Sequence, residues 1–189
     1  TLVHFFIYCL FICSIYGYGL VFNKYIFKYE SNYGEKGLYG FILIYFIVFV
    51  LHFLTPINII ISFSLLIFGI LYCLKNILFS EIKFFYSKEV ILIFLLTYIS
   101  SLTVNLHDDV RSYQLPYINL VQDFKIIFGL VNINDFYAYS HGLYDIMSIF
   151  KIPFYENRFI FLIPVIFVFF FICSIFDIFK KSKSKIVTT

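Results

Sequence analysis

Charged residues are scarce in this sequence. Asp, Glu, Lys and Arg make up only 13% of its 189 residues, whereas a soluble domain carries about a quarter. So few charges cannot cover a water-exposed globule of this length, which excludes a soluble globular protein. With 62% hydrophobic residues and a mean hydropathy of +0.94, most of the chain is expected to lie in lipid.

Cysteine is also infrequent, and all four cysteines lie in apolar segments, which argues against a disulfide framework. Cys9 and Cys13 share one helical face. A metal pair is one interpretation, and small apolar residues in lipid is the favoured one. The sequence has no Walker loop, dinucleotide fingerprint, zinc spacing or catalytic triad pattern. Its basic residues are divided among separate short segments, so nucleic acid is not an expected partner.

The chain begins at Thr1, its only methionine is Met147, and the basic end "KKSKSKIVTT" follows a hydrophobic segment directly. We therefore expect residues 1–189 to be a single membrane domain that is a fragment of a longer protein.

Uncharged stretches predict an all-α integral membrane protein, because a helix of roughly 20 apolar residues spans a bilayer core and pairs all its backbone groups internally. Residues 37–74 carry no Asp, Glu, Lys or Arg, and Pro56 in "TPIN" favours a turn in the middle. About five spans are expected, at residues 1–22, 38–54, 57–74, 90–106 and 159–178.

The distribution of Lys and Arg predicts the orientation, because cytoplasmic loops are enriched in basic residues. Ten of the 14 basic residues lie in one set of segments: Lys24, Lys28, Lys36, Lys75, Lys83, Lys88, Lys180, Lys181, Lys183 and Lys185. The loop of residues 107–158 contains the other four. We expect a multi-pass membrane protein, with its amino terminus and this loop on the extracytoplasmic side.

The external loop is too long for a simple connector and contains two helical patterns. Pro116 suits a first helical position, apolar residues recur from Leu115 to Phe124, and Gly129 is expected to break the segment. Ser140 can cap a second helix that Pro153 ends. Two short amphipathic helices on the outer membrane surface are expected. The loop also concentrates tyrosines, either through interfacial solvation or as a surface on which a substrate stacks.

An acidic pair, Asp108 and Asp109, directly follows the uncharged run that ends at Leu106. It is either an inert hydrophilic stop or a functional centre, with His107 before it and Arg111 after it. Adjacent carboxylates repel, so one could act as a base, or both could hold a divalent metal ion. The remaining histidines of the spans, His4 and His52, are expected to make polar contacts between helices.

Two stretches resemble a family of large bacterial multi-pass membrane proteins related to GT-C type glycosyltransferases. They are "HDDVRSYQLPYINLVQDFKIIFGLVNINDFYAYSHGLYDIMSIFKIP" and, upstream, "EKGLYGFILIYFIVFVLHFLTPIN". The similarity covers about residues 17–165, and the chain corresponds to the amino-terminal part of such proteins. The matching elements are Asp108, Asp109, Tyr113, Leu115, Pro116, Gly129 to Asn132, Ile152 and Pro153.

The resemblance implies transfer of a sugar from a polyprenyl-phosphate donor on the outer face of the membrane, in surface polysaccharide or glycolipid assembly. It implies Asp108 and Asp109 as the catalytic centre and as the ligands of any metal ion. Contacts with the substrate are expected from Arg111, Gln114, His141 and Arg158, although each arginine alone also suits a lipid-headgroup anchor. Gln114 replaces an expected His, which puts activity in question.

Two other functions compete with this interpretation. A transporter or flippase fragment predicts ionisable groups in mid-bilayer, whereas this chain keeps its charges at the ends of spans. A non-catalytic membrane scaffold predicts that the acidic pair is dispensable.

Overall fold

The computed structural model describes residues 2–28, 31–76, 87–103, 108–133, 135–139, 142–151 and 157–187. Within these ranges the regular structure is entirely helical, which confirms the all-α prediction. The seven α-helices are α1 (Leu2–Phe22), α2 (Tyr33–Leu54), α3 (Ile59–Asn76), α5 (Lys88–Leu102), α6 (Leu115–Asp123), α7 (Gly142–Ile149) and α8 (Leu162–Val187).

Four helical segments of the described chain are long and apolar enough to span a membrane. They are Leu2–Phe27, Tyr33–Leu54, Ile59–Asn76 and Phe159–Lys181. These segments correspond to four of the five expected spans, and the protein is a multi-pass membrane protein. The expected hairpin turn at Pro56 separates α2 from α3. Helix α2 begins at Tyr33, before the expected residue 38, because Asn32 and Glu35 form a capping box at its amino-terminal end.

The fifth expected span, residues 90–106, differs from the prediction. Helix α5 has 15 residues, a length of about 22 Å against a bilayer core of about 30 Å. Residues 104–107 lie outside the described ranges. Helix α5 packs instead on α1 and α8, where the Tyr8 hydroxyl donates to Thr97 Oγ1 at 2.9 Å and His4 Nε2 lies 3.0 Å from Ser101 Oγ. The expected helix–helix contact of His4 is confirmed.

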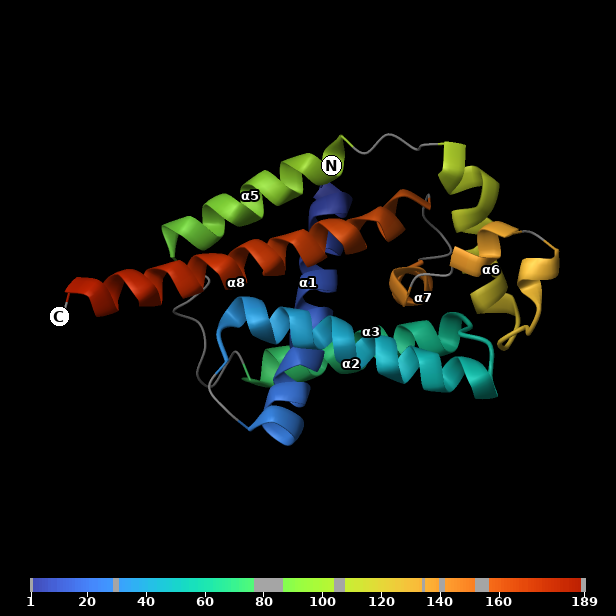
Figure 1. The fold of residues 1–189 in the computed structure, drawn as a ribbon, viewed down its shortest axis with the longest axis horizontal. Helices are drawn as coiled ribbons and strands as arrows, with labels where there is room; N and C mark the ends of the chain where they lie inside the picture. The colour runs from blue at the N-terminus through green and yellow to red at the C-terminus, as the bar shows by residue number, and fades with distance from the viewer. Residues whose placement is uncertain are drawn as a thin grey trace.

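Helix α1 is the centre of the bundle, and it crosses α2, α3 and α8 steeply (Figure 1). Glycines allow its backbone to approach its neighbours. A Cβ added at Gly17 would collide with the carbonyl oxygen of Gly69 on α3, and one at Gly40 of α2 would collide with that of Ile15. Small residues at such crossings permit the close backbone packing that holds membrane helices together.

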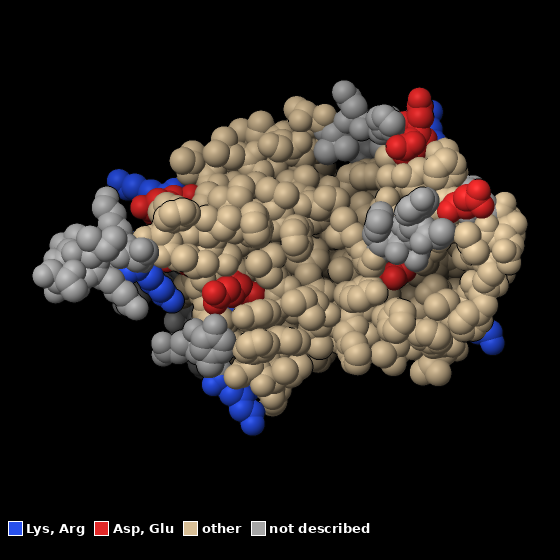
Figure 2. Space-filling model, viewed as in Figure 1, with Lys and Arg blue, Asp and Glu red and all other residues tan. Residues whose placement is uncertain are grey.

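Charged side chains gather at the two ends of the long axis, and on the face shown in Figure 2 the surface between them is largely uncharged. Four elements bring Lys residues toward the end of the long axis at which the chain ends: the first turns of α2 and α5, the last turn of α3, and the carboxyl-terminal part of α8. The π-turn after α1, which contains Lys24, lies at the lower edge of the view in Figure 1. The other end carries the long loop.

The two short helices of the long loop are present, but their positions differ from the prediction. Helix α6 follows a π-turn, Val110–Gln114, and ends at Asp123 rather than near Gly129, because Phe124 adopts an extended backbone. The expected Ser140 cap and the stop at Pro153 lie outside the described residues.

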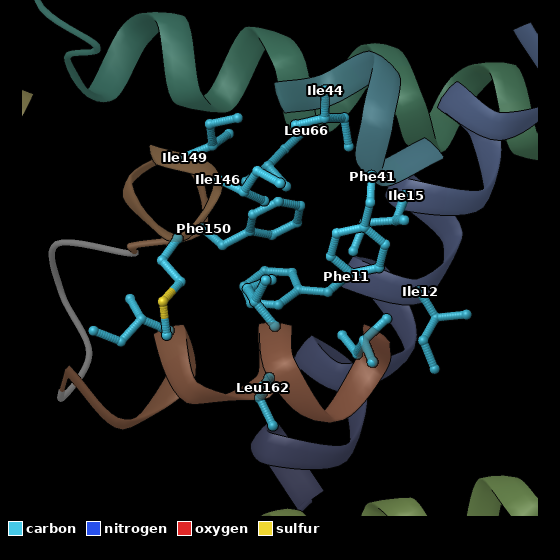
Figure 3. Close-up of a cluster of buried hydrophobic side chains, with 14 of the residues drawn as sticks. Phe11, Ile12, Ile15, Phe41, Ile44, Leu66, Ile146, Ile149, Phe150 and Leu162 are labelled. Carbon is cyan, nitrogen blue, oxygen red and sulfur yellow. The ribbon is translucent and has the colours of Figure 1, made fainter. Parts of the chain in front are cut away.

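Helix α7 was expected on the membrane surface, yet it lies inside the bundle. All residues from Asp145 to Phe150 are buried. Phe150 packs edge-on against Phe11 of α1, with ring centroids 4.6 Å apart, and Ile146 and Ile149 point toward α2 and α3 (Figure 3). The expectation failed because the polar residues of α7 suggested a solvated face, whereas Asp145 accepts a hydrogen bond from Tyr117 and the Ser148 hydroxyl donates to the carbonyl of Asp145 within the helix.

We expect Gly17→Val to destabilise the bundle by about 1 to 3 kcal/mol, because the added side chain must push α1 away from α3. Cys9→Val, at a half-buried position of the same helix, is the matched control and is expected to have little effect. Unfolding in mixed micelles with increasing dodecyl sulfate measures both variants. Equal stability of the Gly17→Val variant and the native protein would contradict the close contact.

Candidate functional site

The acidic pair lies at the start of a helical run at the loop-bearing end of the bundle. Asp108 and Asp109 are helical and exposed, and the run continues through the π-turn into α6. The charge of Asp109 affects the ionisation of the Tyr144 hydroxyl on α7. Burial raises the pKa of Tyr144, and the neighbouring Tyr113 and Asp109 raise it further. The acidic pair therefore borders α7.

The other expected site residues are placed only in part. Arg111 is exposed and Gln114 is half-buried, and both belong to the π-turn that directly follows the pair. His141 and the side chain of Arg158 lie outside the described part of the chain. Arg111 and Gln114 follow the pair along the chain in one π-turn, and the substrate contacts expected of all four residues stay predictions.

A metal site would need more ligands than the pair supplies. The described residues contain no cluster of three or more His, Cys, Asp or Glu side chains suited to a metal ion. A divalent ion such as Mg²⁺ takes six oxygen ligands and often obtains several of them from water and substrate phosphates. The pair could contribute at most a few of these, and water or a phosphate would have to supply the rest.

Four tyrosines of the long loop, Tyr113, Tyr117, Tyr137 and Tyr144, form an aromatic cluster. The ring of Tyr117 lies 6.2 Å from those of Tyr137 and Tyr144, and Tyr113 stacks on Phe136 at 5.1 Å with an interplanar angle of 11°. The sequence predicted the concentration of tyrosine but not its partners. These rings join α6, through Tyr117, to α7 and to the segment Asp135–Tyr139.

A buried carboxylate behind this cluster was not predicted from the sequence. Asp145 of α7 is 9% exposed, and the Tyr117 hydroxyl donates to its Oδ1 at 3.2 Å. Burial raises the pKa of Asp145, and the hydrogen bond from Tyr117 and the nearby charge of His52 partly oppose that rise. A carboxyl group with an environment of this kind is a candidate for proton transfer.

The spacing of apolar residues in α7 did not indicate that Asp145 is buried. It lies on the side of α7 opposite Leu143 and Met147, which predicts a solvent-facing carboxylate. The helix is buried on that side as well, so the carboxylate contacts the aromatic cluster. The sequence shows only that Asp145 is a single acidic residue in an apolar stretch. Its partner, Tyr117, is brought to it by long-range packing.

His52, at the carboxyl-terminal end of α2, fixes the loop against the bundle. Its Nε2 lies 3.1 Å from the carbonyl oxygen of Phe124, and its own carbonyl accepts from the amide of Ile126 at 3.0 Å. The amide of Ile57 donates to the carbonyl of Val121 at 3.0 Å. His52 makes a polar contact, but to the backbone of the loop and not to another helix as expected.

A cavity of about 320 Å³ opens beside this junction, at the small end of the range of ligand pockets. Its walls come from the end of α2, from α6 and from the segment after α6. The lining residues are His52, Tyr117, Leu120, Val121, Lys125, Ile126, Ile127, Phe128, Gly129, Leu130, Val131 and Tyr137.

We expect Tyr117→Phe to cost about 1 to 2 kcal/mol at neutral pH, because it removes the donor to a buried carboxylate. The pKa of Asp145 is higher in the folded protein than in the unfolded chain. Stability therefore falls as pH rises from the unfolded-state pKa to the folded-state pKa. The variant raises this pKa further, and its deficit should shrink at acidic pH, where Asp145 is protonated in both proteins. Thermal unfolding in detergent from about pH 4 to about pH 8 measures the difference. Tyr137→Phe is the control, and a deficit independent of pH would contradict the Tyr117–Asp145 contact.

Neither a curated protein nor a solved structure matches this chain. One family matches it, and the match extends over the entire sequence, residues 1–189. The chain belongs to the family described as Domain of unknown function (DUF8201).

Proposed function

We propose that this chain is the amino-terminal part of a membrane glycosyltransferase-like protein that takes a sugar from a polyprenyl-phosphate donor. The reaction would take place on the extracytoplasmic face of the bacterial inner membrane, in surface polysaccharide or glycolipid assembly. The observation that carries the proposal is the position of the exposed acidic pair at the loop-bearing end of the bundle, beside the aromatic cluster.

The position of the pair fits a donor that arrives through the lipid. A polyprenyl chain keeps its phosphate and sugar at the membrane–water boundary, so the base that acts on an acceptor must lie there too. The helical segment that begins at Asp108 lies at the loop-bearing end of the bundle (Figure 1), and both carboxylates of the pair are exposed.

In the proposed reaction, the carboxylate of Asp108 or Asp109 removes the proton from an acceptor hydroxyl group. The hydroxyl oxygen attacks the anomeric carbon of the sugar, and the bond from that carbon to the phosphate oxygen breaks. The polyprenyl phosphate leaves with the electron pair. Arg111, in the turn that follows the pair, would bind the leaving phosphate, for which a guanidinium group is well suited.

The neighbouring tyrosines supply a surface on which a sugar ring can stack. Tyr113 is half-buried and lies beside Tyr144, which Asp109 also approaches. Gln114 directly follows Tyr113 and offers an amide to a sugar hydroxyl in place of the imidazole that the family resemblance implies.

The charge distribution separates this proposal from a transporter. A transport pathway through the bundle would require ionisable groups near mid-bilayer. Two buried ionisable residues of the described chain, Asp145 and His52, instead contact Tyr117 and Phe124, in the segment that forms the loop-bearing end.

We expect Asp108→Asn or Asp109→Asn, whichever removes the base, to lower sugar transfer about 100-fold or more, because a positioned general base contributes at least that factor. The assay places the full-length protein in vesicles with radiolabelled polyprenyl-phosphate mannose or glucose and follows loss of label from the lipid fraction.

Asp135→Asn, which removes another exposed carboxylate of the same loop, is the matched control and should retain transfer. Unchanged transfer in both pair variants, with unfolding temperatures equal to the native value, would favour a non-catalytic scaffold and reject the proposal.

A further inference from the structure

The segment that follows α6 exposes an unusual amount of hydrocarbon. Phe128 is 81% exposed and Ile133 is 78% exposed. Other exposed apolar residues of the same region are Phe124, Ile127, Val131 and Phe136. We call residues 124–133 the apolar loop. Within it, Lys125 is the only charged residue.

Exposure of this kind is unfavourable in water, since each large apolar side chain gains roughly 1.5 to 3 kcal/mol when it leaves water. A contiguous exposed apolar patch marks a surface that another apolar phase covers. Lipid is the phase already present, because the apolar loop is attached to a helix that spans the membrane.

The apolar loop also continues the lipid-facing side of α2. The ring of Phe128 lies 6.4 Å from that of Phe53. Phe53 belongs to the exposed apolar side of α2, together with Phe46, Phe49 and Val50. Because Phe128 extends the exposed apolar side of α2, it is expected to face the bilayer as that side does.

The cavity lies directly behind the apolar loop, and seven consecutive residues of the loop, Lys125 to Val131, form part of its wall. Its lining is mostly hydrocarbon. Among the lining residues, His52 and Lys125 are the two that can carry positive charge, and none is Asp or Glu. Tyr117 directs its hydroxyl hydrogen to Asp145, so attraction of an anion falls to Lys125 and His52.

We propose that the apolar loop inserts into the bilayer surface, and that the cavity behind it binds one membrane lipid with an anionic headgroup. The acyl chain packs against the hydrocarbon walls, and the headgroup lies at Lys125, which is exposed at the rim. This inference does not rest on sugar transfer, and it would hold for a scaffold as well.

The absence of tryptophan from the chain provides a direct test, because a single introduced Trp is the only fluorophore of its kind. Phe128→Trp reports on the loop and Tyr137→Trp on the cavity. Each purified full-length protein, with any tryptophan outside residues 1–189 replaced, is placed in phosphatidylcholine vesicles that contain a minor fraction of brominated lipid. The brominated lipid is either phosphatidylglycerol or phosphatidylcholine and quenches a Trp that it contacts.

We expect the Phe128→Trp signal to be quenched by both brominated lipids, since insertion of the apolar loop does not depend on the headgroup. The Tyr137→Trp signal should be quenched by the phosphatidylglycerol at about one-fifth of the concentration that phosphatidylcholine requires, because one Lys near an anionic headgroup contributes about 1 kcal/mol.

Lys125→Gln, added to Tyr137→Trp, should abolish this preference without disturbing the fold, because Lys125 is exposed. Lys151→Gln is the matched control. Lys151 lies at the same end of the bundle, bonds to Asn119 and does not line the cavity, so this variant should retain the preference.

Three results would overturn the proposal. They are a Phe128→Trp signal that brominated lipid does not quench, equal quenching of Tyr137→Trp by the two lipids, and loss of the preference in Lys151→Gln as well as in Lys125→Gln. Displacement of the phosphatidylglycerol signal by inorganic phosphate would also contradict it, because the hydrocarbon walls would then contribute nothing to binding.

Discussion

Three hydrogen bonds between the α2–α3 turn and the end of α6 determine the geometry of the loop-bearing end. They join Ile57 to Val121, Ile126 to the backbone of His52, and the His52 imidazole to Phe124. Non-helical backbone beside a bilayer must find partners within the protein, because lipid offers none. The two irregular segments therefore pair each other's backbone hydrogen-bonding groups. This pairing ends α6 at Asp123, holds the apolar loop against α2 and creates the cavity.

The close packing of α1 against α2 and α3 determines where α7 lies in the loop-bearing end. Glycine contacts such as Gly17 with Gly69 bring α1 against α2 and α3 and leave room beside α1 for α7. With α7 buried, Asp145 reaches Tyr117, and Tyr144 lies near Asp109. The exposed acidic pair and the buried carboxylate thus lie on two sides of one aromatic cluster.

The sequence predicted the features that depend on local composition. Uncharged runs located four spans, Pro56 located the turn between α2 and α3, and spacing located both short helices of the loop. What the sequence could not predict depends on contacts between distant residues. The burial of α7 requires α1, α2, α3 and α8 around it. The Tyr117–Asp145 bond joins residues 28 positions apart, and no local pattern distinguishes a buried Asp145 from a solvated one. The roles expected for His141 and Arg158 stay predictions.

The central claim is that the loop-bearing end is a fixed structure built on the α2–α3 turn. Hydrogen exchange of the protein in lipid nanodiscs tests it most directly, at the amides of Ile57 and Ile126. Both amides donate to carbonyls across the junction, so both are expected to exchange far more slowly than the same residues in an unstructured peptide. Exchange of these two amides at the rate of an unstructured peptide, while α2 and α3 remain protected, would contradict the account.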